Sequence, residues 1–102
     1  MGRKIIRSVY WDKKAFEDFI LILEYIRKDS PANEKLVRRR VMNIIKLLPT
    51  RPEMYKTDEL KTPNDGSFRV FVKNNIRVSY KIEKRVILIA RVRHSSQEPI
   101  SY

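Results

Sequence analysis

The last third of the chain contains three short runs in which β-branched and aromatic residues alternate with polar ones. These runs cover residues 68–72, 76–82 and 86–92, and short polar segments separate them. Successive side chains of a strand point to opposite faces of a sheet, and short connections join antiparallel neighbours. The pattern therefore predicts an antiparallel meander with one apolar face, and that face needs a cover of other elements.

The first half of the chain is predicted to supply this cover as two helices. Asp12 is suited to cap a helix over residues 13–28. Ser30 followed by Pro31 is suited to begin a second helix, which Pro49 ends. Apolar residues recur at helical spacing in both segments. The predicted apolar stripes are Ala15, Phe16, Phe19, Ile20, Leu23 and Ile26 in the first helix, and Val37, Val41, Ile44, Leu47 and Leu48 in the second.

The remaining segments complete the predicted domain. Residues 4–11 are rich in β-branched and aromatic side chains, so we expect an opening strand there. Residues 50–67 are rich in proline and turn-forming residues, which predicts a long connector without regular structure. We therefore expect a single α+β domain over residues 1–102 in the order β-α-α-β-β-β. It would have an antiparallel sheet with a helical hairpin packed on one face.

The composition narrows the chemistry that this chain can perform. With 23 Lys and Arg against 12 Asp and Glu, its formal net charge is +11, which favours polyanionic partners such as nucleic acid. The chain has no cysteine and one histidine, so a disulfide, a thiolate nucleophile and a typical zinc site are excluded, and no metal or other cofactor is expected. No apolar segment is long enough to span a membrane, and the first ten residues lack the features of a signal peptide. We expect residence in the cytoplasm and no membrane partner.

Four arginines in the predicted strands are candidate phosphate ligands. Guanidinium groups bind phosphate oxygens through paired hydrogen bonds, and these side chains are expected to converge on the exposed face of the sheet. The alternative is that they only keep the sheet soluble. Two lysines of the connector are candidates for further phosphate contacts, with ordinary solvent exposure as the alternative. The arginines are Arg69, Arg77, Arg91 and Arg93, and the lysines are Lys56 and Lys61.

His94 and Tyr102 are candidates for proton transfer near these arginines. Histidine is the residue type whose unperturbed pKa lies near neutrality. His94 directly follows the last predicted strand and is suited to exchange protons with an RNA 2′-hydroxyl or a leaving oxygen. Tyr102 is suited to stack on a base or to donate a proton, while the arginines stabilise charge on the phosphate oxygens. The alternative for His94 is a loop histidine that bonds a nearby carbonyl.

Short motifs follow one another along the chain in an order that is typical of one family. The motifs are Val9-Tyr10-Trp11 before a helix, Tyr25-Ile26-Arg27 followed by Ser30-Pro31, Leu48-Pro49, Phe68-Arg69-Val70-Phe71, Ile76-Arg77-Val78-Ser79-Tyr80, and Ile89-Ala90-Arg91-Val92-Arg93-His94. Together they resemble the toxins of the RelE/ParE superfamily, which are partners in type II toxin–antitoxin pairs. The resemblance covers most of the chain, and the last two motifs are the most specific.

The resemblance implies a toxin, and the mRNA-cleaving branch of the superfamily implies roles for individual residues. In that branch, basic residues hold the scissile phosphate, and messenger RNA is cut on the ribosome by metal-independent attack of its 2′-hydroxyl. By position, Arg69 and Arg77 match the phosphate ligands. His94 and Tyr102 are candidates for the remaining catalytic groups. A ribosome-dependent mRNA endonuclease that arrests translation is thus the leading hypothesis.

Two alternatives remain open from the sequence. In the gyrase-inhibiting branch of the superfamily the acid–base set is incomplete. Here Phe71 stands where some nucleases have a lysine, and Gln97 replaces an arginine. A non-enzymatic inhibitor of DNA gyrase is therefore the second hypothesis, and a non-toxic basic domain that binds nucleic acid is the third. For either toxin the resemblance implies a cognate antitoxin, which we expect to contain an acidic, partly disordered segment.

Overall fold

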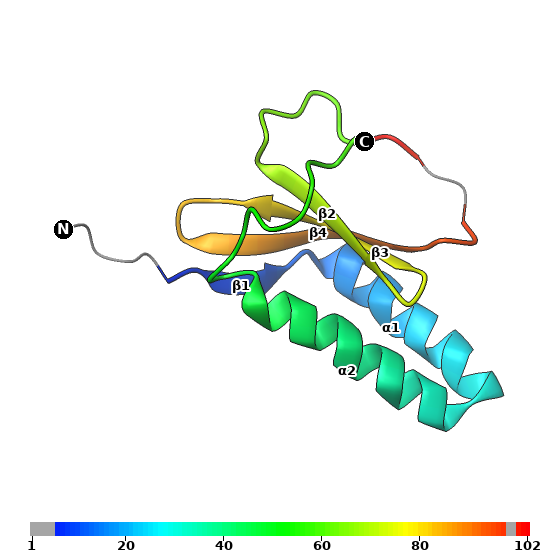
Figure 1. Cartoon of the computed structure of the whole chain (residues 1–102). Coiled ribbons are helices and arrows are strands. Elements are labelled where there is room, and N and C mark those ends of the chain that lie inside the picture. The colour runs from blue at the N-terminus through cyan, green and yellow to red at the C-terminus, as the bar shows by residue number, and fades with distance from the viewer. Residues whose placement is uncertain (1–5, 98–99) are drawn as a thin grey trace.

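The computed structural model describes residues 6–97 and 100–102, which form a four-stranded sheet and two helices (Figure 1). The predicted order of elements is confirmed. The elements are β1 (Ser8–Trp11), α1 (Lys13–Asp29), α2 (Pro31–Leu47), β2 (Phe68–Lys73), β3 (Ile76–Ile82) and β4 (Val86–His94). The first residues of the expected opening strand, Lys4 and Ile5, lie outside the described part of the chain.

Local signals in the sequence set the ends of both helices. The side chain of Asp12 accepts a hydrogen bond from the backbone N–H of Ala15 at 3.1 Å, and Ser30 caps α2 through the N–H of Asn33 at 3.1 Å. Each cap satisfies a backbone donor that has no partner within the first turn of its helix. Pro31 is the first residue of α2, where its missing N–H costs nothing. The two helices form a hairpin that covers one face of the sheet (Figure 1).

The sheet has the strand order β1-β4-β3-β2 and is mixed. Strands β2, β3 and β4 form the predicted antiparallel meander. The expectation of an entirely antiparallel sheet needs one correction, because β1 runs parallel to β4, with Ser8 opposite Val86 and Trp11 opposite Ile89. Parallel neighbours require a long crossover connection, and the two helices lie within the segment that joins β1 to the meander.

A tight turn fixes the register of β2 and β3. Its two central residues, Asn74 and Asn75, have φ angles of 51° and 65°. Two successive positive φ angles are typical of the type I′ turn, which asparagine tolerates and whose twist matches that of a hairpin. The resulting register places Phe71 opposite Val78, so Phe71 lies in the core under the helices. Arg69 has the same parity as Phe71, so the phase expected for β2, with Arg69 on the exposed face of the sheet, is wrong.

A bulge in β4 changes which of its side chains face the helices. The register shifts between Ser79 and Tyr80 of β3, and Ala90 of β4 has no partner there. One extra residue reverses the alternation of a strand. As a result, Ile89 before the bulge and Val92 after it both lie in the core, while the arginines on either side of Val92 lie on the opposite face.

The core lies between the helical hairpin and the sheet, and it is narrower than the predicted stripes. Along α2 the buried positions follow a spacing of four residues, Val37, Val41 and Ile45. Leu47, which was predicted to be buried, is 55% exposed, and Phe16 and Ile20 of α1 are 48% and 38% exposed. The buried apolar residues of the helices are Ala15, Phe19, Leu23, Val37, Val41 and Ile45, and Leu48 follows α2.

Substitution of Val41 by aspartate is expected to destabilise the fold severely. Val41 is fully buried, so the new carboxylate would lack a partner and water, at a cost of at least about 3 kcal/mol. Thermal unfolding followed by circular dichroism measures the effect. Asn43→Asp introduces the same carboxylate on the exposed side of α2 and should leave the unfolding midpoint nearly unchanged. Equal midpoints for the two variants would contradict the assigned packing.

Candidate functional site

The sheet face opposite the helices is covered by the connector, residues 50–67, and by residues 100–102 (Figure 1). The connector pairs with the edge of β2 through the hydrogen bonds from Asp58 N to Phe68 O at 2.8 Å and from Val70 N to Lys56 O at 3.0 Å. Side chains on this face therefore lie under the connector rather than in open solvent. We call it the connector face.

The carboxylate of Asp58 lies at the centre of the connector face and is 1% exposed. It accepts hydrogen bonds from the Arg77 guanidinium at 2.6 Å, from the Tyr102 hydroxyl at 2.5 Å and from the backbone N–H of Leu60 at 3.0 Å. Burial alone would raise the pKa of Asp58, but hydrogen bonds from Tyr102, Ser79, Leu60 and Arg77 outweigh it and lower the pKa. Asp58 is therefore a buried, ionised carboxylate with a full set of donors.

Tyr102 is held on this face by both its backbone and its ring. Its N–H donates to the Leu60 carbonyl at 2.8 Å, and its main-chain oxygen accepts from Thr62 N at 3.0 Å. The ring meets Phe68 edge to face at 6.0 Å, and the Arg91 guanidinium lies 4.7 Å from the ring centre. Burial, and then the hydrogen bond to Asp58, raise the pKa of the Tyr102 hydroxyl. The hydroxyl is thus protonated at neutral pH and donates to Asp58.

Three of the four predicted arginines share the connector face. Arg77 lies opposite Arg93 across the β3–β4 pairing, and Arg91 lies opposite Ser79. Arg77 also contacts Glu59 at 3.3 Å, and Arg91 donates to the carbonyl of Ile100 at 2.5 Å. Burial and then the charge of Arg93 lower the pKa of Arg91. The predicted convergence is therefore correct for these three side chains, but Arg77 and Arg91 are already engaged with the chain itself.

Arg69 does not join this group. In the register of β2 and β3 it lies opposite Tyr80, on the side of the sheet that faces the helices. Its guanidinium donates to the carbonyls of Gly66 and Tyr55, both at 3.0 Å. Arg69 thus ties β2 to the two ends of the connector, and the expectation that four arginines converge is wrong at this position. The cause is the inverted phase of β2.

His94 directly follows Arg93 in β4 and therefore faces the opposite side of the sheet from the arginine group. It is the last residue of β4 rather than a residue after the strand, and it lies opposite Ile76, which is in the core. Its Nδ1 accepts from the backbone N–H of Ser96 at 3.1 Å and lies 2.7 Å from the Ser96 hydroxyl. His94 and Tyr102 therefore lie on opposite sides of the sheet.

The two connector lysines have separate surroundings. Lys56 forms an ion pair with Glu59 at 3.6 Å, and both side chains are largely exposed. Lys61 donates to the main-chain oxygen of Tyr102 at 3.3 Å and lies 5.0 Å from the centre of the Phe68 ring. Lys61 therefore helps to hold Tyr102, whereas Lys56 is free to contact a ligand by exchanging an exposed ion pair.

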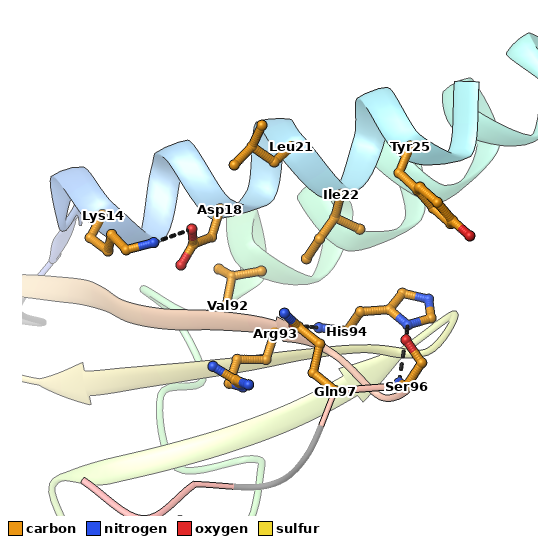
Figure 2. A pocket seen from close by; sticks show the side chains of 10 residues that line it. All are labelled: Lys14, Asp18, Leu21, Ile22, Tyr25, Val92, Arg93, His94, Ser96 and Gln97. Atoms are coloured by element: carbon orange, nitrogen blue, oxygen red, sulfur yellow. Dashed lines mark hydrogen bonds and ion pairs between the residues drawn. The ribbon is translucent and has the colours of Figure 1, made fainter. Parts of the chain in front are cut away.

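A groove of about 370 Å³ between α1 and the end of β4 was not predicted from the sequence (Figure 2). Leu21 and Tyr25, which are 60% and 71% exposed, belong to its α1 wall. Figure 2 shows Val92 directed from β4 toward α1 and His94 at one end of the groove. The sequence does contain one indication of this groove. Leu21 and Tyr25 stand four positions apart on α1, on one side of the helix and outside the predicted apolar stripe.

The part of the chain that the structure describes contains no group of three or more His, Asp or Glu side chains suited to hold a metal ion. It also contains no helix long and apolar enough to cross a membrane.

Comparison with known proteins identifies the family. The family model described as "ParE toxin of type II toxin-antitoxin system, parDE" matches residues 9–99. The chain belongs to the ParE toxin family. A solved structure titled "Chromosomal ParDE TA system from P. aeruginosa" is similar in fold, with a TM-score of 0.66 and 16% sequence identity over 87% of this chain and 96% of that chain. No curated protein matches the sequence.

Membership of the ParE family confirms the resemblance to the RelE/ParE superfamily and the role of a toxin in a type II system. It also implies an antitoxin as partner. Neither the family nor the fold assigns roles to Arg69, Arg77, His94 or Tyr102, so the catalytic roles of these residues stay predictions.

Substitution of Asp58 by asparagine in this ParE-family toxin is expected to lower the free energy of unfolding by about 3 kcal/mol at pH 7, because Arg77 and Tyr102 lose a buried anionic acceptor. The folded-state pKa of Asp58 lies below its ordinary value of 3.8. The ionised carboxylate therefore contributes stability above that value, and the contribution falls as the pH drops through the lowered pKa.

Urea unfolding at pH 7 and near pH 3 measures both effects. The difference between wild type and Asp58→Asn should shrink in acid. Glu53→Gln removes an exposed carboxylate of the same connector and should change little at either pH. A difference that stays constant from pH 7 to pH 3 would show that the charge of Asp58 is not what stabilises the connector face.

Proposed function

We propose that this ParE-family toxin arrests growth by binding DNA gyrase and inhibiting it, without cleaving nucleic acid itself. The observation that carries the proposal is the separation of the two candidate proton-transfer groups, His94 and Tyr102, by the sheet. Membership of the ParE family supports the same choice.

Cleavage of RNA through its 2′-hydroxyl needs one group to accept the proton of that hydroxyl and another to protonate the leaving oxygen, both within hydrogen-bond reach of one phosphate. The Tyr102 hydroxyl donates a hydrogen bond to Asp58, and the pKa of this hydroxyl is raised. Both features disfavour a role of Tyr102 as a base. His94 lies at the groove beside α1. One phosphate in contact with Arg91 and Tyr102 would therefore have His94 on the other side of the sheet.

The mRNA endonuclease remains the second candidate, favoured by the cluster of Arg77, Arg91 and Arg93. A depression of about 180 Å³ lies beside this cluster, and His94 at the end of β4 lines it together with Arg77 and Arg93. Its guanidinium groups are of the kind that bind phosphate. For catalysis, however, residues 100–102 would have to leave the face, because Arg91 and Asp58 hold them there.

A paired assay separates the two candidates. Purified wild type and His94→Ala are each added to a gyrase supercoiling reaction and to a translation extract. We expect both proteins to inhibit supercoiling within about twofold of one another and to leave transcripts intact, because His94 has no catalytic task in a binding inhibitor. The Val41→Asp variant, which is expected to be severely destabilised, serves as the inactive control once its loss of folded structure is confirmed by circular dichroism.

Two results would contradict the gyrase proposal. One is normal supercoiling at excess toxin. The other is discrete cleavage within translated messages that His94→Ala abolishes, which would establish the endonuclease with His94 in its active site.

We also propose that the groove beside α1 receives the antitoxin. Leu21 and Tyr25 offer exposed apolar surface, and two cations lie at the groove, Arg93 and Lys14, of which Lys14 is paired with Asp18 through an exposed ion pair that an acidic segment could exchange as it becomes ordered. Apolar anchors would supply the affinity and the +11 charge of the chain would speed association.

Leu21→Ala is therefore expected to weaken binding of the cognate antitoxin at least about tenfold, since it removes a central apolar contact. Leu47→Ala, which truncates an equally exposed leucine on α2 outside the groove, is the matched control and should have little effect.

Isothermal titration at 50 mM and 500 mM salt should also show weaker binding of the antitoxin at high salt. Equal affinities for the two variants would place the antitoxin elsewhere, and an affinity independent of salt would exclude association led by charge.

A further inference from the structure

The excess of positive charge is distributed unevenly between the two helices. In α1 four basic residues are balanced by four acidic ones. In α2 five basic residues stand against Glu34 alone, so these 17 residues carry a net charge of +4. This difference is not required by the core, because both helices bury a similar apolar stripe.

Three of these basic residues share one solvent face of α2. Lys35, Arg39 and Lys46, together with Asn43, fall on one side of the helix at 3.6 residues per turn, turned away from the buried row that contains Val41. All four are exposed. We call them the α2 stripe. With a rise of 1.5 Å per residue, it extends for about 16 Å along the helix axis.

The cations of the α2 stripe are not neutralised by acidic neighbours. Within residues 6–97 and 100–102, Lys35, Arg39 and Lys46 form no ion pair. Other cations of the protein are paired, such as Lys14 with Asp18 and Arg77 with Asp58. A row of unpaired cations on a rigid helix is an electrostatic footprint suited to a regular polyanion.

From this we infer that the α2 stripe binds the phosphate backbone of duplex DNA without sequence preference. A stripe of about 16 Å is long enough to contact more than one phosphate, because duplex DNA carries one negative charge for about every 1.7 Å of its axis. Lysine, arginine and asparagine are the side-chain types that contact phosphates in such complexes. A duplex could then be held on the side of the protein that the sheet and the connector face do not use.

The composition of the α2 stripe argues against other partners. An acidic protein segment would be expected to gain most of its affinity from buried aromatic or aliphatic anchors, and the stripe has none. Single-stranded nucleic acid is generally bound by stacking on aromatic side chains, which the stripe also lacks. The inference does not depend on gyrase as the target, because it concerns direct contact of this chain with DNA.

The test uses two triple variants with the same change in charge. K35Q/R39Q/K46Q removes the cations of the α2 stripe, whereas K73Q/K84Q/R85Q removes two lysines and one arginine that are exposed at the turns of the meander. Both variants carry a formal net charge three units below the +11 of wild type. All six side chains are exposed, so both proteins should keep the wild-type unfolding midpoint, which is checked first.

Binding to a labelled 20-base-pair DNA duplex of arbitrary sequence is then followed by fluorescence anisotropy between 50 and 300 mM salt. For K35Q/R39Q/K46Q we expect affinity at least about tenfold lower at 100 mM salt, and a slope of log K against log salt that is smaller by about 2 to 3. K73Q/K84Q/R85Q should stay within about twofold of wild type.

Equal losses for the two triple variants would mean that diffuse charge rather than the α2 stripe binds DNA, and would overturn the inference. So would wild-type affinity for DNA in K35Q/R39Q/K46Q. A 20-base-pair RNA duplex and a single strand of the same length serve as competitors. If either displaces the DNA duplex at lower concentration, and this advantage is lost in K35Q/R39Q/K46Q, the partner is RNA or single-stranded nucleic acid and the assignment to duplex DNA is wrong.

Discussion

The buried carboxylate of Asp58 is the interaction on which the connector face depends. It joins three segments that are far apart in the sequence, because its partners are Arg77 of β3, Tyr102 and its own connector. Placing one charge out of water is costly unless donors surround it, and here a guanidinium, a hydroxyl and a backbone amide all converge on it. The connector, which has little regular structure, is thereby given a fixed position over the sheet.

The same interactions limit what chemistry this face can perform. Arg77 is directed at an internal carboxylate, Arg91 at the carbonyl of Ile100, and the Tyr102 hydroxyl at Asp58. Groups that a nuclease would use on its substrate are here used on the chain itself. The polar groups of the connector face thus already have hydrogen-bond partners within the chain. Such a face is better suited to stabilise the fold than to assemble an acid–base site.

Local signals explain what could be predicted from the sequence. Asp12, Ser30 and Pro31 fix the helix ends through contacts within three residues of each other, and the three runs of β-branched residues give the meander. What could not be predicted depends on distant contacts. In β2, Phe68 and Phe71 have opposite parity, so both faces of the strand carry apolar residues, and the phase is set by pairing with β3 across the Asn74–Asn75 turn.

The candidate site could also be predicted only in part from the sequence, because the burial of Asp58 depends on residues far from it in the chain. An aspartate in a turn-rich segment has no sequence pattern that distinguishes a solvated carboxylate from a buried one. Alternation along the strand predicts that Arg91 and Arg93 share one face of β4, and the bulge at Ala90 makes this the face of Arg77. Their internal partner was missed because it is contributed by the segment with the least periodicity.

The bulge at Ala90 determines both which residues of β4 enter the core and on which side of the sheet His94 lies. Strict alternation along β4 would place both of its arginines on the same face as Ile89, under α1, where burial of two guanidinium groups without partners would cost several kcal/mol. The extra residue moves these arginines to the connector face and returns Val92 to the core. The same shift places His94, two residues further on, beside the α1 groove. The bulge that keeps the arginines out of the core therefore also places His94 on the opposite side of the sheet from Tyr102, which is the separation on which the proposed gyrase-binding function rests.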